Sequence, residues 1–185
     1  DYWIKNGNET QNKAKKGTAI VMDPKTGDIL ALAVKPDYDP NTPFDPLSEE
    51  DKQRWEGLSS EELRDERLKM WRNFAVSDVY EPGSTFKIIT TAAGLEEGAV
   101  QPGRTFYCKG SITVGGRNLE CWRSYNPHGH QTFTEAVQNS CNPVFIEVAQ
   151  RLGKEKFLDY IEAFGFGEPT GVDLPGEAAG IVMNP

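Results

Sequence analysis

The chain has 185 residues, enough to bury one hydrophobic core, so its length predicts a single domain. Its apolar share of 37% and charged share of 26% fit a globular protein and argue against wholesale disorder. A formal net charge of -8 argues against a nucleic-acid partner, because phosphates are bound by basic surfaces. No stretch reaches the roughly 20 apolar residues that span a bilayer and no signal peptide is visible, so we expect this segment to be soluble.

The first part of the chain is expected to form a linker, a hairpin and a loop. Residues 1–16 are polar and aperiodic, which predicts a linker or the tail of a preceding element. Residues 18–22 and 29–34 are apolar and partly β-branched, and the turn-rich hexapeptide between them predicts a β-hairpin. Residues 35–46 contain four prolines, which favour an extended surface loop over a helix or a central strand.

The rest of the chain is expected to combine helices with one more hairpin. Residues 48–71 are densely charged and predict one or two solvated helices, broken near Gly57. Two pairs are spaced as helix-starting capping boxes, Ser59 with Glu62 and Thr132 with Glu135. The other expected elements are a loop at 82–87 leading into a buried helix at 88–95, a hairpin over 105–122 that turns at Gly115 and Gly116, a polar loop at 123–130, a helix from Pro143 to about Leu152 stopped by Gly153, and a helix over 154–164.

Ser84 and Lys87 form an S-x-x-K pair at the start of the expected buried helix. Residues three apart share one helix face, so the lysine amine can reach the serine hydroxyl. Burial that lowers the pKa of Lys87 would let its amine take the hydroxyl proton, and the helix N-terminus would favour the negative charge that develops nearby. The pair predicts a serine nucleophile with a lysine base, and the alternative is an ordinary helix cap.

A proton relay needs a second polar group, and an S-x-N triplet supplies a hydroxyl and an amide. Two triplets are present, at residues 140–142 and at residues 124–126. We favour Ser140 and Asn142, because they lie between two expected helices whose packing can fix short side chains. The K-T-G sequence at 25–27 lies in the first hairpin turn, where its expected role is only to turn the chain.

The three cysteines, Cys108, Cys121 and Cys141, lack the paired spacing of a zinc site and are expected to be packed or free thiols. A disulfide between two of them would require an oxidising compartment. Because Cys141 lies inside an S-x-N triplet, its oxidation could distort the serine and the asparagine. His128 and His130 are interpreted as loop residues, and no metal or cofactor is expected.

These motifs together resemble the serine acyltransferases that include penicillin-binding proteins and β-lactamases. Longer stretches make the chain similar to class B penicillin-binding protein transpeptidases of the elongation, division or sporulation type, of which it would be the N-terminal part only. The stretches that carry this resemblance are residues 17–31, 36–41, 80–87, 128–142, 164–171 and 175–177. The resemblance implies an α/β fold, more narrowly α+β: part of the penicillin-binding protein/β-lactamase-like transpeptidase fold, with antiparallel sheet strands and a helical subdomain.

The resemblance also implies roles for four residues. Ser84 would attack a D-Ala-D-Ala stem peptide of peptidoglycan with Lys87 as base, Ser140 would relay the proton, and Asn142 would bind the substrate. β-Lactams would acylate Ser84 because they mimic that dipeptide. The implied partners are stem peptides, β-lactams and other cell-envelope synthesis proteins, and the implied location of the whole protein is the extracytoplasmic face of the bacterial cytoplasmic membrane.

One departure from the family pattern concerns a K-T-G strand, which the family has downstream of S-x-N. None follows Asn142 here, so residues 17–185 are interpreted as a transpeptidase domain truncated before that strand, and as a poor enzyme alone. Two alternatives stay open. One is a β-lactamase or D-Ala-D-Ala carboxypeptidase, which passes the acyl group to water, and the other is a non-catalytic β-lactam sensor or interaction domain.

Overall fold

The computed structural model of the protein describes residues 16–183, and within these the chain forms two compact units. The first unit contains the residues up to Val79 together with Gly171–Ala178, and the second contains Tyr80–Thr170 with the residues from Ala179 onward. The length alone predicted one domain. The expected linker at 1–16 lies outside the described residues except for its last position. No helix in the described part of the chain is long and apolar enough to cross a membrane.

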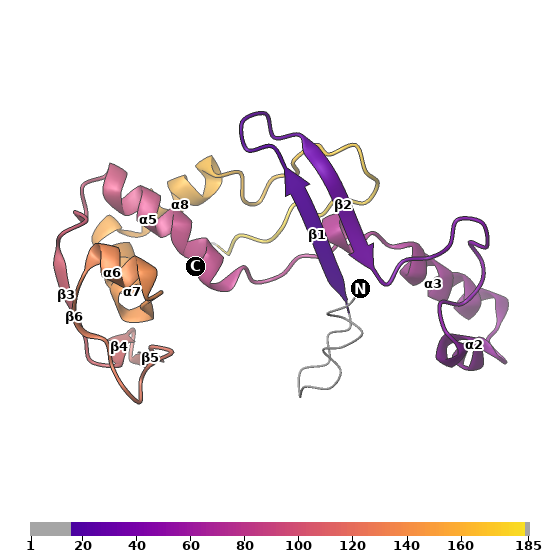
Figure 1. The fold of residues 1–185 in the computed structure, drawn as a ribbon, viewed down its shortest axis with the longest axis horizontal. Helices are drawn as coiled ribbons and strands as arrows, with labels where there is room; N and C mark the ends of the chain where they lie inside the picture. Colours follow the sequence, from indigo (N-terminus) through magenta and orange to yellow (C-terminus); the bar gives the residue numbers. More distant parts are fainter. Residues whose placement is uncertain (1–15, 184–185) are drawn as a thin grey trace. The chain divides into compact units, whose positions relative to one another are not determined.

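The first unit begins with the predicted hairpin (Figure 1). Strand β1 (Gly17–Met22) pairs antiparallel with β2 (Ile29–Lys35), with a register irregularity between Val21 and Met22. The turn between the strands contains the K-T-G sequence. The Asp23 carboxylate accepts the Lys25 N–H at 2.8 Å, and Gly27 has a φ of +81°, which favours glycine. The prediction of a hairpin is confirmed, and the backbone accounts for these three residues as a turn.

The helices of the first unit are solvated, as their charge predicted. Among the described residues of this unit they are α2 (Glu49–Trp55), α3 (Ser60–Trp71) and the short α4 (Phe74–Ser77), and none of the three has a buried residue. The capping box that begins α3 is present, because Ser59 Oγ accepts the Glu62 N–H and the Glu62 carboxylate accepts the Ser59 N–H. The loop before α2 contains no helix or strand.

The second unit contains most of the buried residues and four α-helices. Its helical elements are the 3₁₀ turn η2 (Gly83–Phe86), α5 (Lys87–Glu96), α6 (Phe133–Gln138), α7 (Asn142–Leu152) and α8 (Lys154–Ala163). The predicted capping box of Thr132 and Glu135 begins α6. Pro143 lies in the first turn of α7, and Gly153 ends it with a φ of +80°. Helix α7 packs against α5 and α8, which fixes the starts of α5 and α7 relative to each other.

The strands of the second unit correct one prediction. β4 (Ser111–Val114) and β5 (Arg117–Glu120) form the hairpin that turns at the two glycines, but β3 (Thr105–Cys108) pairs with β6 (Gly129–Thr132) instead. The observed hairpin is therefore about half as long as the one expected over 105–122. The loop expected at 123–130 is also shorter, because β6 begins within it. The cause is Gly110, whose φ of +100° turns the chain after β3 and whose carbonyl accepts the Cys121 N–H at 2.8 Å.

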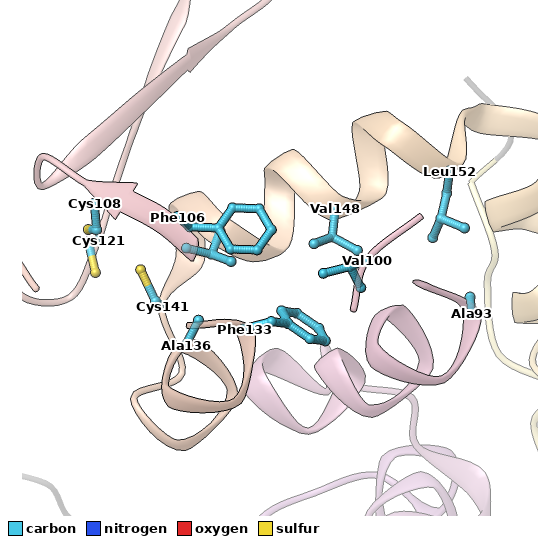
Figure 2. Close-up of a cluster of buried hydrophobic side chains, with 11 residues drawn as sticks. Ala93, Val100, Phe106, Cys108, Cys121, Phe133, Ala136, Cys141, Val148 and Leu152 are labelled. Carbon is cyan, nitrogen blue, oxygen red and sulfur yellow. The ribbon is translucent and has the colours of Figure 1, made fainter. Parts of the chain in front are cut away.

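The hydrophobic core of the second unit joins its helices to β3 (Figure 2). Val148 of α7 and Ala93 of α5 are fully buried, and Phe106 of β3 and Phe133 of α6 are almost so. Burial of a Val or Phe side chain contributes about 1.5–3 kcal/mol. The core therefore supplies a rigid support for the ends of α5, α6 and α7 that carry the candidate catalytic residues.

Candidate active site

Ser84 and Lys87 are brought together by the 3₁₀ turn that precedes α5. Ser84 lies within η2 and is exposed, whereas Lys87 is the first residue of α5 and is half-buried. Side chains three apart eclipse each other in a 3₁₀ helix. Lys87 Nζ consequently lies 3.4 Å from Ser84 Oγ, as the S-x-x-K spacing predicted.

Ser140 has a left-handed backbone, with a φ of +50°, which is uncommon for any residue other than glycine. The end of α6 explains it. The Ser140 N–H donates to the Val137 carbonyl and the Cys141 N–H donates to the Ala136 carbonyl, the two hydrogen bonds of a Schellman motif. This motif usually places glycine at the position of Ser140. The strain is tolerated here at a residue whose hydroxyl faces Ser84 and Lys87, a placement typical of functional sites.

The lysine amine is the centre of the hydrogen-bond network that joins the two motifs. Lys87 Nζ donates to the carbonyl and the hydroxyl of Ser140, both at 2.8 Å, and to Asn142 Oδ1 at 2.6 Å. The Ser140 hydroxyl in turn donates to Ser84 Oγ at 3.2 Å. With a neutral amine and the two hydroxyl hydrogens reoriented, the same distances would give a proton on Ser84 a direct route to Lys87 and a second route through Ser140.

Desolvation makes the Lys87 amine easier to deprotonate than a free lysine. Desolvation lowers the pKa of the amine, while negative charge on Cys141 and Cys121 would act in the opposite direction. The Phe145 ring lies 5.2 Å from Nζ and belongs to the buried side chains beneath it. All four hydrogen-bond partners of Nζ are uncharged oxygens, so they do not hold the proton on the amine as a carboxylate would. A lysine in this setting is suited to act as a base.

Asn142 ties the network to the β4–β5 hairpin. Its Oδ1 atom accepts from Lys87, and its Nδ2 atom donates to the Glu120 carbonyl at 3.1 Å. The Trp122 indole N–H, two residues further on, donates to the Asn139 carbonyl at 2.9 Å. These contacts hold the end of β5 and the residues after it against the end of α6 and the start of α7.

A pocket of about 430 Å³ opens onto the three polar side chains Ser84, Lys87 and Ser140. Its remaining wall is largely apolar, formed by residues of α5 and α6 such as Ile88 and Val137. Pockets of this size with a few convergent polar groups are typical of small-molecule and peptide-end binding. The Ser84 hydroxyl therefore lies at the edge of a largely apolar pocket that has room for a small group.

Residues 17–185 match the family described as the penicillin binding protein transpeptidase domain. The chain belongs to this family. It is 46% identical over 166 residues to stage V sporulation protein D of Bacillus subtilis, which covers 89% of this chain and 23% of the relative. It is 32% identical over 187 residues to peptidoglycan D,D-transpeptidase MrdA of Acinetobacter baumannii, covering 26% of that protein. The chain thus spans about a quarter of the length of these curated relatives.

Solved structures of transpeptidases agree with the fold. Penicillin-binding protein 3 of Mycobacterium tuberculosis complexed with ampicillin superposes with a TM-score of 0.72 at 33% identity, over 92% of this chain and 33% of that one. The same protein complexed with aztreonam gives a TM-score of 0.72 as well. The expected α+β transpeptidase fold is confirmed.

The structure places the two S-x-N triplets of the sequence in different surroundings. Ser124, the other S-x-N serine, lies in a loop where its hydroxyl is 3.5 Å from a Glu120 carboxylate oxygen, and it does not line the pocket. Two contributors to the candidate site were not identified from the sequence, the Phe145 ring near Lys87 and the Glu120 carbonyl that accepts from Asn142. No sequence pattern indicates a backbone carbonyl contact between residues 22 positions apart.

The cysteines and one histidine also lie closer together than their spacing suggested. Cys108, Cys121 and Cys141 are buried free thiols, and His128 lies among them. His130 lies outside this group and packs on the Tyr107 ring with centroids 4.8 Å apart. Both histidines were expected to be loop residues. This is wrong for His130, which lies in β6, whereas His128 lies in the loop before that strand.

Proposed function

We propose that this chain is part of a peptidoglycan D,D-transpeptidase that acts by acyl transfer through Ser84. The observation that carries the proposal is the convergence of Ser84, Lys87, Ser140 and Asn142 within hydrogen-bond distances, from two segments more than 50 residues apart. The relative named peptidoglycan D,D-transpeptidase MrdA supports the same reaction.

In the first half-reaction, Ser84 Oγ attacks the carbonyl carbon of the penultimate D-Ala of a stem peptide. Its proton passes to the neutral Lys87 amine, directly or through the Ser140 hydroxyl. The peptide bond then breaks, and the same proton returns through Ser140 to the nitrogen of the departing D-Ala. The products are free D-Ala and an ester between the shortened stem peptide and Ser84.

In the second half-reaction, an amine of a neighbouring stem peptide attacks the ester carbonyl carbon. Lys87 accepts a proton from the attacking nitrogen, and the ester bond to Ser84 Oγ breaks. That proton then restores the Ser84 hydroxyl, so the site returns to its starting state. A β-lactam follows the first half-reaction only, because its ring-opened amine stays attached and the ester persists.

The same reaction supports a location and a set of partners. Peptidoglycan stem peptides are cross-linked outside the cytoplasmic membrane, so we place the whole protein on the extracytoplasmic face of that membrane with other cell-envelope synthesis proteins. We also propose that the 185 residues by themselves are a poor enzyme, since the K-T-G strand that the family pattern has after S-x-N is not among them.

The proposed function is tested by prolonged incubation with excess benzylpenicillin, followed by intact mass measurement and peptide mapping. We expect one penicilloyl adduct, on Ser84, that is lost in Ser84→Ala. Ser124→Ala is the matched control and should keep the adduct. An adduct on another residue, or none in a chain with a native melting transition, would refute the assignment of Ser84.

A further inference from the structure

Four potential metal ligands from four separate segments lie close together beside the S-x-N motif, and one of them is part of it. Cys108 ends β3, Cys121 follows β5, His128 precedes β6, and Cys141 caps α7. Their ligand atoms all lie within 4.8 Å of one another. The three thiols have exposed fractions of 0%, 2% and 0%, and Figure 2 shows their sulfur atoms converging at one end of the hydrophobic core.

The distances are close to those of a tetrahedral site. With metal–sulfur bonds of about 2.3 Å and a metal–nitrogen bond of about 2.0–2.1 Å, neighbouring ligands of a tetrahedral zinc ion lie roughly 3.5–3.8 Å apart. Cys121 Sγ and His128 Nδ1 are 3.5 Å apart. Small movements of the other side chains would bring the whole set to such separations.

His128 is poorly explained as an ordinary structural histidine. Its Nδ1 atom faces only the weakly hydrogen-bonding Cys121 thiol, and its Nε2 atom is buried without a partner among the described residues. Buried polar atoms are nearly always hydrogen-bonded, so an exception requires an explanation. A metal ion bound to Nδ1 would give this nitrogen a strong partner in place of a single thiol.

We propose that Cys108, Cys121, His128 and Cys141 bind one Zn²⁺ ion in a closed structural site. Thiolates and imidazole in a tetrahedral arrangement favour zinc over magnesium, calcium or manganese, which prefer oxygen ligands. Four protein ligands leave no open coordination position, so the ion has a structural role and takes no part in the acyl transfer. The pairwise spacing that marks many zinc sites is absent because each ligand comes from a different segment.

The site has a consequence for the catalytic network, and this step rests on the proposed function. Cys141 separates Ser140 from Asn142, and Cys121 follows Glu120, whose carbonyl accepts a hydrogen bond from Asn142. An ion that joins Cys121 to Cys141 therefore fixes the end of β5 against the S-x-N motif. Its removal should loosen the hydroxyl and amide that surround Lys87.

The test begins with metal content. The chain, purified under reducing conditions with zinc present and then desalted, is measured by inductively coupled plasma mass spectrometry. We expect about one zinc per chain, as for a four-ligand structural site, and tetrahedral thiolate–cobalt absorption after exchange with Co²⁺. His128→Gln should lose most of the metal, whereas His130→Gln, a histidine two residues away and outside the cluster, should retain it. Zinc far below one per chain in the folded wild type, or equal loss in both variants, would overturn the proposal.

Two further measurements test the metal site separately from folding and from the proposed function. Mass measurement with and without reductant detects a disulfide, and a disulfide between any two of the three cysteines in the purified protein would also overturn the proposal. Penicillin labelling is then measured with zinc bound and after chelation, with a severalfold loss expected. Zinc binding without any labelling refutes the proposed function alone, and labelling of a folded wild-type chain that binds no zinc refutes the metal site alone.

Discussion

Lys87 Nζ donates to both oxygens of Ser140, the main-chain carbonyl and the side-chain hydroxyl, at 2.8 Å each. Ser140 makes both contacts from a left-handed backbone conformation, with a φ of +50°. The serine thus serves the site in two ways. Its carbonyl helps to position Lys87, and its hydroxyl lies between Lys87 and Ser84.

Replacing Ser140 separates these two contributions. Ser140→Gly keeps the carbonyl and relieves the strain of the positive φ, whereas Ser140→Ala keeps the strain, and both remove the hydroxyl. If the hydroxyl relays the proton, penicillin acylation should fall about 10²-fold or more in both variants, the usual contribution of a positioned acid–base group. The rate is followed by the mass of the adduct over time. A Ser140→Gly protein that acylates at the wild-type rate would show that only the backbone matters.

The pH dependence of acylation should follow the protonation of Lys87. Desolvation lowers the pKa of this amine below its ordinary value, so a larger fraction is neutral at a given pH than for a free lysine. If the neutral amine is the base, as proposed, the acylation rate should rise with pH and level off above the folded-state pKa, with a midpoint below the ordinary value of about 10.4. Lys87→Arg, which stays charged, should not acylate at any pH tested. A rate independent of pH from mildly acidic to alkaline conditions would contradict Lys87 as the base.

Asn142→Asp is expected to shift that profile. The new carboxylate would replace the amide oxygen that lies 2.6 Å from Lys87 Nζ, and a negative charge at this distance stabilises the protonated amine. The pKa of Lys87 should rise, so acylation at neutral pH should fall while the rate at alkaline pH partly recovers. Asn139→Asp is the control, since Asn139 lies near the motif and its side chain contacts Gln131 rather than Lys87. Equal shifts in both variants would mean that the effect is not local.

The features that could be predicted from the sequence are those set by neighbouring residues. Ser59 with Glu62 and Thr132 with Glu135 form capping boxes within one helical turn, and the S-x-x-K pair meets within one turn of η2. The pairing of β3 with β6 and the gathering of the cysteines depend on how the chain folds between distant segments. The positive φ of Gly110 turns the chain directly after β3, and β3 pairs with the distant β6 instead of with β4.

Gly94 is expected to be required for the packing of α5 on α7. A Cβ atom at this position would lie 2.8 Å from Val148 Cγ1 and 3.1 Å from Val100 Cγ1, both in branched, fully buried side chains. Gly94→Ala gains about 1 kcal/mol of helix propensity, but overpacking costs typically 1–3 kcal/mol, so a lower free energy of unfolding is expected. Gly103→Ala is the matched control, because a Cβ there meets no atom within 4 Å. Thermal unfolding compares the two, and a Gly94→Ala protein more stable than wild type would contradict the tight contact.

The 185 residues should react with β-lactams slowly even though Ser84, Lys87, Ser140 and Asn142 are assembled. In the family pattern the K-T-G strand also supplies a backbone N–H to the oxyanion that forms during attack on the carbonyl. Losing one such donor costs about 10²–10³-fold in rate in other acyl transferases, whereas the proton route through Lys87 does not depend on it. A fluorescent penicillin should therefore label Ser84 at least about 10²-fold more slowly than it labels a transpeptidase domain that contains all three motifs. Rapid stoichiometric labelling would mean that the groups in η2, α5 and the S-x-N loop are sufficient for acylation without that strand.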